Sequence, residues 1–119
     1  MNGLHLIGDL TGCRCDPQLL LDGESFRAKC IEMVAAAGLT TMDATFHTFD
    51  GGGFTGTVVL AESHLAIHTF PETGLATLNA YCCRPREAPR WRELLGELLD
   101  AREVGVTEHA RGRPAGTGP

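Results

Sequence analysis

The chain is poor in lysine and has no long hydrophobic run. Lys29 is its single lysine, and it lies in a segment with helical periodicity. A pyridoxal-phosphate enzyme needs a well-placed lysine for its Schiff base, so we do not expect that cofactor. The longest apolar runs, such as residues 33–39, are far shorter than the ~20 residues that span a bilayer. The sequence therefore predicts no membrane segment.

Positive charge is also scarce in this 119-residue chain. Its 10 Lys and Arg stand against 15 Asp and Glu, which gives a formal net charge of −5 at pH 7 and argues against a nucleic-acid groove. The first residues lack the basic-then-apolar pattern of a secretory signal, so we expect a cytoplasmic protein. The length fits one domain with one core.

Five cysteines are many for this length, but the pattern is not that of a disulfide scaffold. Their number is odd, and their spacing fits neither paired bridges nor a CxxC zinc site. They are Cys13, Cys15, Cys30, Cys82 and Cys83. No group of histidines and cysteines has a recognised ligand spacing. We therefore expect free thiols and no bound metal.

Hydrophobic periodicity predicts the order of the elements. Strands are expected over residues 4–10, 39–49, 55–60, 64–70, 75–82 and 103–109, with a loop at 11–17 and a glycine turn at 51–53. Helices are expected over residues 23–37 and, starting after Pro89, through the apolar positions Trp91 to Leu99. The order β-α-β-β-β-β-α-β predicts an α+β fold, a two-layer sandwich of a mainly antiparallel sheet with two helices on one face. The other face must be polar or covered by a partner.

This single domain is expected to span residues 1–110, with a flexible tail at 111–119. The most informative stretch is residues 61–72, where titratable groups interrupt a β-forming context. If it forms a hairpin with its apex near Ser63, Thr57 lies opposite His68, with Thr55 one pair further on. A serine at a strained apex near a histidine can attack the preceding carbonyl. Strand alternation puts Ser63 and His68 on opposite faces, so this chemistry needs a bulge or a sharp turn there.

These residues stand in an order that resembles a known family. The matching pieces are His5-Leu6-Ile7, Phe46-His47-x-Phe49, Gly53-x-x-Gly56, Ala61-Glu62-Ser63-His64-Leu65-x-Ile67-His68-Thr69, Pro71-Glu72, Cys83, and Glu108-His109-Ala110-Arg111-Gly112-Arg113. Over most of its length, the chain resembles the proenzyme of bacterial S-adenosylmethionine decarboxylase, a pyruvoyl enzyme of polyamine synthesis. No gap is needed between Phe46 and Cys83, which makes the motif specific.

The resemblance implies that the chain cleaves itself between Glu62 and Ser63, into a β chain of residues 1–62 and an α chain of residues 63–119. Ser63 would become a pyruvoyl group, which takes the place of pyridoxal phosphate. Its ketone forms a Schiff base with the substrate amine and accepts the electrons released with CO₂. The product, decarboxylated S-adenosylmethionine, would supply spermidine biosynthesis. Members of the family are typically homodimers with sites at the interface, which would also cover the second sheet face.

The resemblance also implies a role for each matching side chain. Cys83 is the implied proton donor, because a thiol titrates close enough to neutral pH to give up a proton. His68, together with the hydroxyl of Thr55, is implied in self-processing. Substrate contacts are implied for Phe49, Glu72 and Leu65. An aromatic face such as that of Phe49 attracts both a purine and a sulfonium, and a carboxylate such as that of Glu72 accepts two ribose hydroxyls.

The sequence departs from the family pattern at several positions. Position 55 is usually serine and is Thr55 here, and the usual aspartate at position 79 is Asn79. The usual Phe-Thr-Cys-Gly reads Tyr81-Cys82-Cys83-Arg84, the usual tryptophan before Pro71 is Phe70, and the Cys13-Arg14-Cys15 loop looks like an insertion. Two alternatives therefore stay open. One is a pyruvoyl-dependent decarboxylase of another amino acid, such as arginine or ornithine, and the other is a non-catalytic relative that binds a ligand.

Overall fold

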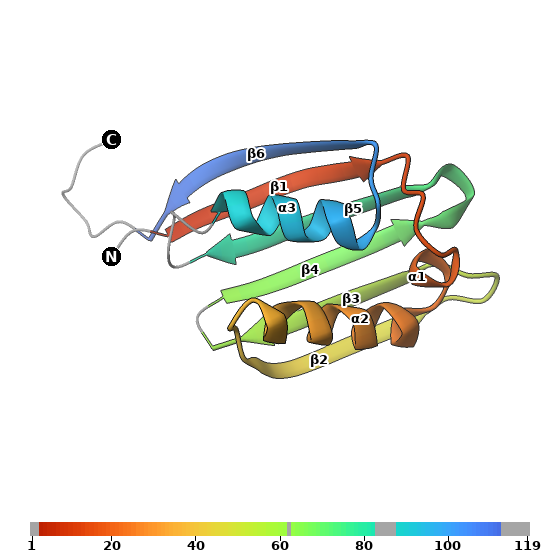
Figure 1. The fold of residues 1–119 in the computed structure, drawn as a ribbon, viewed down its shortest axis with the longest axis horizontal. Coiled ribbons are helices and arrows are strands. Elements are labelled where there is room, and N and C mark those ends of the chain that lie inside the picture. Colours follow the sequence, from red (N-terminus) through yellow and green to blue (C-terminus); the bar gives the residue numbers. More distant parts are fainter. Residues whose placement is uncertain (1–2, 62, 83–87, 113–119) are drawn as a thin grey trace.

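The computed structural model describes residues 3–61, 63–82 and 88–112, and it shows a six-stranded sheet with helices on one face (Figure 1). The elements in chain order are β1 Gly3–Thr11, α1 Gln18–Leu21, α2 Gly23–Ala36, β2 Thr41–Thr48, β3 Phe54–Leu60, β4 Ser63–Phe70, the 3-10 helix η1 Pro71–Thr73, β5 Leu75–Cys82, α3 Ala88–Leu98 and β6 Glu103–Arg111. The expected α+β sandwich is confirmed.

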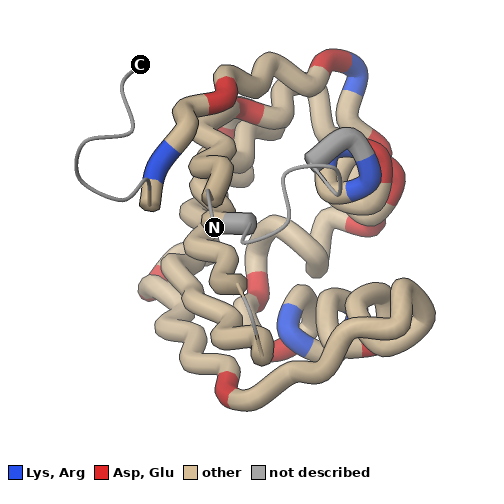
Figure 2. The backbone as a smooth tube through the Cα atoms, turned by 90° about the vertical axis from the view of Figure 1, so that its left-hand side faces the viewer, with Lys and Arg blue, Asp and Glu red and all other residues tan. Residues whose placement is uncertain are grey.

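The strands lie in the order β2-β3-β4-β5-β1-β6, and each pairs antiparallel with its neighbours. Strands β2 to β5 follow one another in the chain and in the sheet, because short turns join them. Strand β1 then pairs with both β5 and β6, so the first and last strands lie side by side (Figure 1). Seen along the strands, α2 and α3 lie on the same side of the sheet (Figure 2), as expected.

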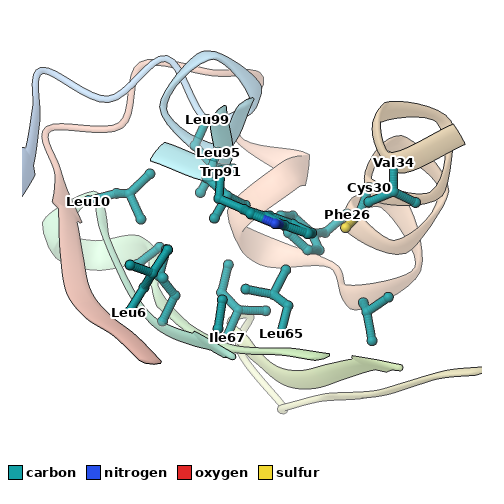
Figure 3. Packing of buried hydrophobic residues seen from close by; sticks show 14 of the residues in the cluster. Leu6, Leu10, Phe26, Cys30, Val34, Leu65, Ile67, Trp91, Leu95 and Leu99 are labelled. Atoms are coloured by element: carbon teal, nitrogen blue, oxygen red, sulfur yellow. The ribbon is translucent and has the colours of Figure 1, made fainter. Parts of the chain in front are cut away.

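The core lies between the sheet and these two helices (Figure 3). Its members include Leu6, Leu10, Leu65 and Ile67 from the sheet, Phe26, Cys30 and Val34 from α2, and Trp91, Leu95 and Leu99 from α3 and the residue after it. Burying each such aliphatic or aromatic side chain contributes about 1.5–3 kcal/mol. At Gly56, an added Cβ would overlap the ring of its pairing partner Phe46, so this position needs glycine for packing.

Among the described residues, no helix covers the opposite side of the sheet, which we call the open face. Strand alternation directs every second side chain to it. On β4 these are the residues between the buried Leu65, Ile67 and Thr69, and the strand pairings extend the same face across the sheet. All five histidines of the chain lie on this face: His5, His47, His64, His68 and His109. Groups that transfer protons are thus gathered on the side that the chain's own core does not use.

The expected register of the β3–β4 hairpin is wrong by two residues. Thr55, rather than Thr57, lies opposite His68, and Val58 lies opposite Leu65. A one-residue slip turns every side chain to the other face, whereas a two-residue slip keeps each one on its own face. The alternation of apolar residues cannot distinguish these two registers. The correction brings Thr55 closer to His68 than the sequence indicated.

The remaining differences are at short elements and at element ends. Helices α1 and η1 have 4 and 3 residues, too few to show a periodicity, and the sequence did not predict them. Strand β6 extends to Arg111, so the flexible tail expected over residues 111–119 does not include Arg111, and residues 113–119 lie outside the described residues. In the described part of the chain, no helix is long and apolar enough to cross a membrane.

Candidate active site

A pocket of about 350 Å³ opens at the end of the sheet where β4 leads into η1. Its lining comes from the β2–β3 turn, the start of β3, the end of β4 and η1. The lining residues are Phe49, Gly52, Gly53, Phe54, Thr55, His68, Thr69, Phe70, Pro71 and Glu72. The volume lies within the range of small-molecule sites, and the lining combines apolar side chains with a few polar groups. This pocket is the candidate active site.

Thr55 and His68 form the polar centre of the pocket. They are paired across β3 and β4, and Thr55 Oγ1 lies 2.8 Å from His68 Nδ1. The hydrogen bond fixes the ring and engages Nδ1, so Nε2 is the nitrogen left for another partner. The structure thus places side by side the two residues for which the resemblance implies a joint role.

Phe49 and Glu72 stand at the rim of the same pocket. Phe49 follows the last residue of β2, and its side chain is 49% exposed. Glu72 lies in η1, which begins with Pro71 and ends at Gly74 in the left-handed conformation with φ 64°. Proline suits the first position of a helix, and glycine suits its left-handed end. The local sequence thus places an aromatic face and a carboxylate on one cavity.

Thr69 links α1 and the start of β3 to β4 beside the pocket, a role the sequence analysis missed. Its hydroxyl donates to the Leu20 carbonyl at 2.7 Å and accepts from the Phe54 N–H at 3.0 Å, and the residue is only 6% exposed. The Gly53 N–H donates to the Leu21 carbonyl at 2.9 Å. The sequence contained a signal for this role, because Thr69 is a polar residue at a core-facing position of β4, and buried polar groups need hydrogen-bond partners.

Ser63 lies at the opposite end of β4 from this pocket. It is the first residue of β4, half-buried, and its partner on β5 is Cys82. Pairing with β5 continues without a bulge from Ser63 to Phe70, so alternation puts Ser63 and His68 on opposite faces. At about 3.3 Å per residue, they are about 16 Å apart along the strand. The bulge or sharp turn that was needed to bring them together is absent from the described part of β4.

Two of the expected site residues, Glu62 and Cys83, lie outside the described residues. Leu65 is fully buried in the core, so its implied substrate contact has to come from its backbone.

Cys13, Cys15 and Cys30 are free thiols, and burial raises the pKa of Cys30 to about 11. Among the described residues, no group of three or more His, Cys, Asp and Glu side chains is placed to hold a metal ion.

Comparisons with known proteins agree with the fold. A family model described as S-adenosylmethionine decarboxylase matches residues 4–112. The S-adenosylmethionine decarboxylase proenzyme of Caldicellulosiruptor saccharolyticus is 37% identical over 112 residues, which cover 92% of this chain and 88% of that protein. The proenzyme of Thermotoga maritima is 36% identical over 113 residues, which cover 93% and 85%. The crystal structure of the adenosylmethionine decarboxylase from Aquifex aeolicus superimposes with a TM-score of 0.81 at 33% identity and covers 98% of this chain and 96% of that chain. The resemblance seen in the sequence is confirmed, and the chain belongs to the S-adenosylmethionine decarboxylase family.

Proposed function

We propose that this chain is a proenzyme that cleaves itself before Ser63 and then decarboxylates S-adenosylmethionine. Its relatives carry the name of that activity at 36–37% identity. The observation that carries the proposal is that one pocket collects four residues from separate elements: Phe49, Thr55, His68 and Glu72. Together they offer an aromatic face, a hydroxyl, an imidazole and a carboxylate to a nucleoside that bears an amino acid.

Cleavage begins with attack of the Ser63 hydroxyl on the carbonyl carbon of Glu62, which converts the amide bond into an ester. Loss of the Cα proton of residue 63 then expels the Glu62 carboxylate. Hydrolysis of the remaining dehydroalanine releases ammonia and leaves the pyruvoyl group. The described residues fit such a group, because the new chain end is the first residue of β4 and is held in the sheet by its pairing with Cys82. The pyruvoyl carbonyl supplies an electron acceptor for decarboxylation.

The side chains of the pocket bind the substrate and move protons. Phe49 stacks on the adenine, and Glu72 accepts hydrogen bonds from the ribose hydroxyls. His68, with Nδ1 engaged by Thr55, transfers protons during cleavage through Nε2. Cys83, which follows the residue paired with Ser63, returns a proton to the substrate α-carbon.

The separation of Ser63 and His68 supports an active site shared between two copies of the chain. The middle row across the open face consists of uncharged side chains: Thr45, Thr57, Ala66, Asn79, Ile7 and Thr107. A two-fold axis along this row, perpendicular to the strands, places His68 of one copy over position 64 of the other, one residue from Ser63. Facing sheets pack about 10 Å apart, a gap that their side chains fill. The proposed homodimer therefore places His68 of one copy against the strand position next to Ser63 of the other, whereas within one chain the two residues are about 16 Å apart along β4. The Ser63 side chain itself starts on the helix-covered face and has to turn towards the interface for its attack on Glu62.

The first experiment tests cleavage and the pyruvoyl group. Purified protein should give two fragments on denaturing electrophoresis, and Ser63→Ala should stay intact because it lacks the attacking hydroxyl. Phenylhydrazine or borohydride should modify the fragment that begins at residue 63. If folded wild-type protein stays whole after prolonged incubation and carries no carbonyl, the proposal is wrong and a ligand-binding relative is the better interpretation.

The second experiment tests the substrate. CO₂ release is measured from carboxyl-labelled S-adenosylmethionine, arginine and ornithine, and turnover is expected with the first. Turnover with arginine or ornithine alone would decide for a different pyruvoyl-dependent decarboxylase, an outcome that Thr55, Asn79 and Arg84 make worth testing. The product of the proposed reaction is an aminopropyl donor for spermidine, and we place this reaction in the cytoplasm.

A further inference from the structure

Phe49, which lines the pocket, is in aromatic contact with His47, which does not. The rings of His47 and Phe49 have centroids 4.8 Å apart and planes inclined by 76°. Such a nearly perpendicular arrangement is favourable for aromatic pairs. His47 lies on β2, pairs with Thr55, and is not among the residues that line the pocket. Any effect of His47 on a bound adenosyl group would therefore pass through a neighbour that does line the pocket, either Phe49 or Thr55.

The turn that follows Phe49 fixes the backbone of this residue but does not restrict the orientation of its ring. Its backbone is held by the β2–β3 turn, because its N–H donates to the Gly53 carbonyl at 2.8 Å and its carbonyl accepts from Gly52 at 3.0 Å. Residues 51–53 of that turn are all glycine and have no side chains to restrict the ring. The ring is also half exposed. A half-exposed side chain loses rotamer freedom when a ligand binds, which weakens binding unless the ring is already ordered.

We propose that His47 is a positioning residue that orders the Phe49 ring for stacking on the purine of the substrate. The inference rests on the proposed function, since it assumes that the pocket takes an adenosyl group. The two rings are nearly perpendicular, so the edge of one meets the face of the other, and the half-exposed Phe49 ring keeps accessible surface for the purine. His47 thus contributes to substrate affinity without touching substrate or reacting atoms.

The test compares three substitutions at position 47 in the processed, full-length protein. His47→Ala removes the ring, His47→Asn keeps a polar amide without a ring, and His47→Phe keeps a ring. The probe is 5′-methylthioadenosine, which carries the adenosyl group without the amino acid, and its Kd is measured by calorimetry. An aromatic pair of this kind corresponds to a two- to tenfold effect, roughly, so Ala and Asn should weaken binding by that factor and Phe should restore it.

Steady-state kinetics with S-adenosylmethionine give a second readout. The Ala and Asn variants should raise KM by a similar factor and leave kcat and the extent of self-cleavage nearly unchanged. A double-mutant cycle then shows whether the effect passes through Phe49, because His47→Ala should have no further effect on probe binding in a Phe49→Leu background. Met42→Ala is the matched control, since Met42 is an exposed residue of the same strand outside the pocket.

Three outcomes would overturn the inference. Equal probe binding by wild type and His47→Ala would show that the ring contact has no effect on the adenosyl group. Rescue by Asn rather than Phe would show that His47 acts through a hydrogen bond. A loss of self-cleavage or of kcat would give His47 a part in the chemistry itself. If wild-type protein does not bind 5′-methylthioadenosine at all, the proposed substrate is wrong and this inference is wrong with it. The other three outcomes leave the proposed substrate intact, because in each of them the wild type binds the probe.

Discussion

A shared active site makes a sharp prediction for dimers that contain two different inactive chains. Ser63→Ala removes the attacking hydroxyl, and His68→Ala removes the imidazole that we propose to move the proton. A mixed dimer of these two chains retains one complete site only if Ser63 of one chain meets His68 of the other. The chain that carries His68→Ala should then be cleaved by its partner, and the chain that carries Ser63→Ala should stay whole.

The expected size of the effect follows from the strand geometry. Ser63 and His68 are five residues apart on β4 without a bulge between them, which separates them by about 16 Å. Proton transfer needs heavy atoms within about 3 Å, directly or through one water. Within one chain the two groups therefore cannot cooperate. In the purified mixed dimer, about half of all chains should be cleaved, and all of these should be His68→Ala chains.

The assay uses co-expression of the two variants with different C-terminal tags and tandem purification, so that only mixed dimers are recovered. Denaturing electrophoresis and intact-mass measurement then identify which tagged chain is cleaved. Homodimers of each variant, prepared in parallel, provide the controls. Two results would refute the reasoning: a mixed dimer in which neither chain is cleaved, and a His68→Ala homodimer that is cleaved as fast as wild type.

Two further predictions concern stability and are best measured by urea unfolding in the uncleaved Ser63→Ala background. Thr69→Val should lower the free energy of unfolding by about 2–4 kcal/mol, because the Leu20 carbonyl and the Phe54 N–H lose their buried partner, whereas Thr69→Ser should cost much less; equal stability of the two variants would contradict this. Burial raises the pKa of Cys30 from its ordinary 9.0 to about 11, so only the unfolded chain ionises in between. Stability from this thiol is complete below pH 9 and is lost towards pH 11, up to about 3 kcal/mol. Cys30→Ala should remove that loss between pH 9.0 and about pH 11, and an unchanged loss would show that other groups cause it.

The sequence was sufficient for features that depend on periodicity. Long alternating and helical patterns identified six strands, two main helices and the helices' common face, and the structure confirms them. The opposite orientations of Ser63 and His68 also follow from alternation, and β4 is regular enough to preserve them. Where a pattern spans two or more turns of helix or several strand residues, burial of one face imposes the structure.

Features that depend on loop length or on contacts between distant segments could not be predicted. The hairpin register was missed because a two-residue shift leaves every side chain on its own face. The pocket was missed as a unit, since Phe49 and Glu72 meet only after β2, β3 and β4 have paired. Short helices such as α1 and η1 carry too few residues for a periodic signal, although α1 supplies the carbonyls that bind Thr69 and Gly53.

The division of the sheet into two faces separates the requirements of folding from those of chemistry. The helix-covered face holds the apolar core, and substitutions there act on stability first. The open face holds all five histidines and the Thr55–His68 pair, none of which the core needs. Because the core does not use these groups, their substitution should leave a single chain folded while it impairs cleavage or assembly. Because the proposed site exists only between two copies, the chain can complete folding before the reaction that breaks its own backbone becomes possible.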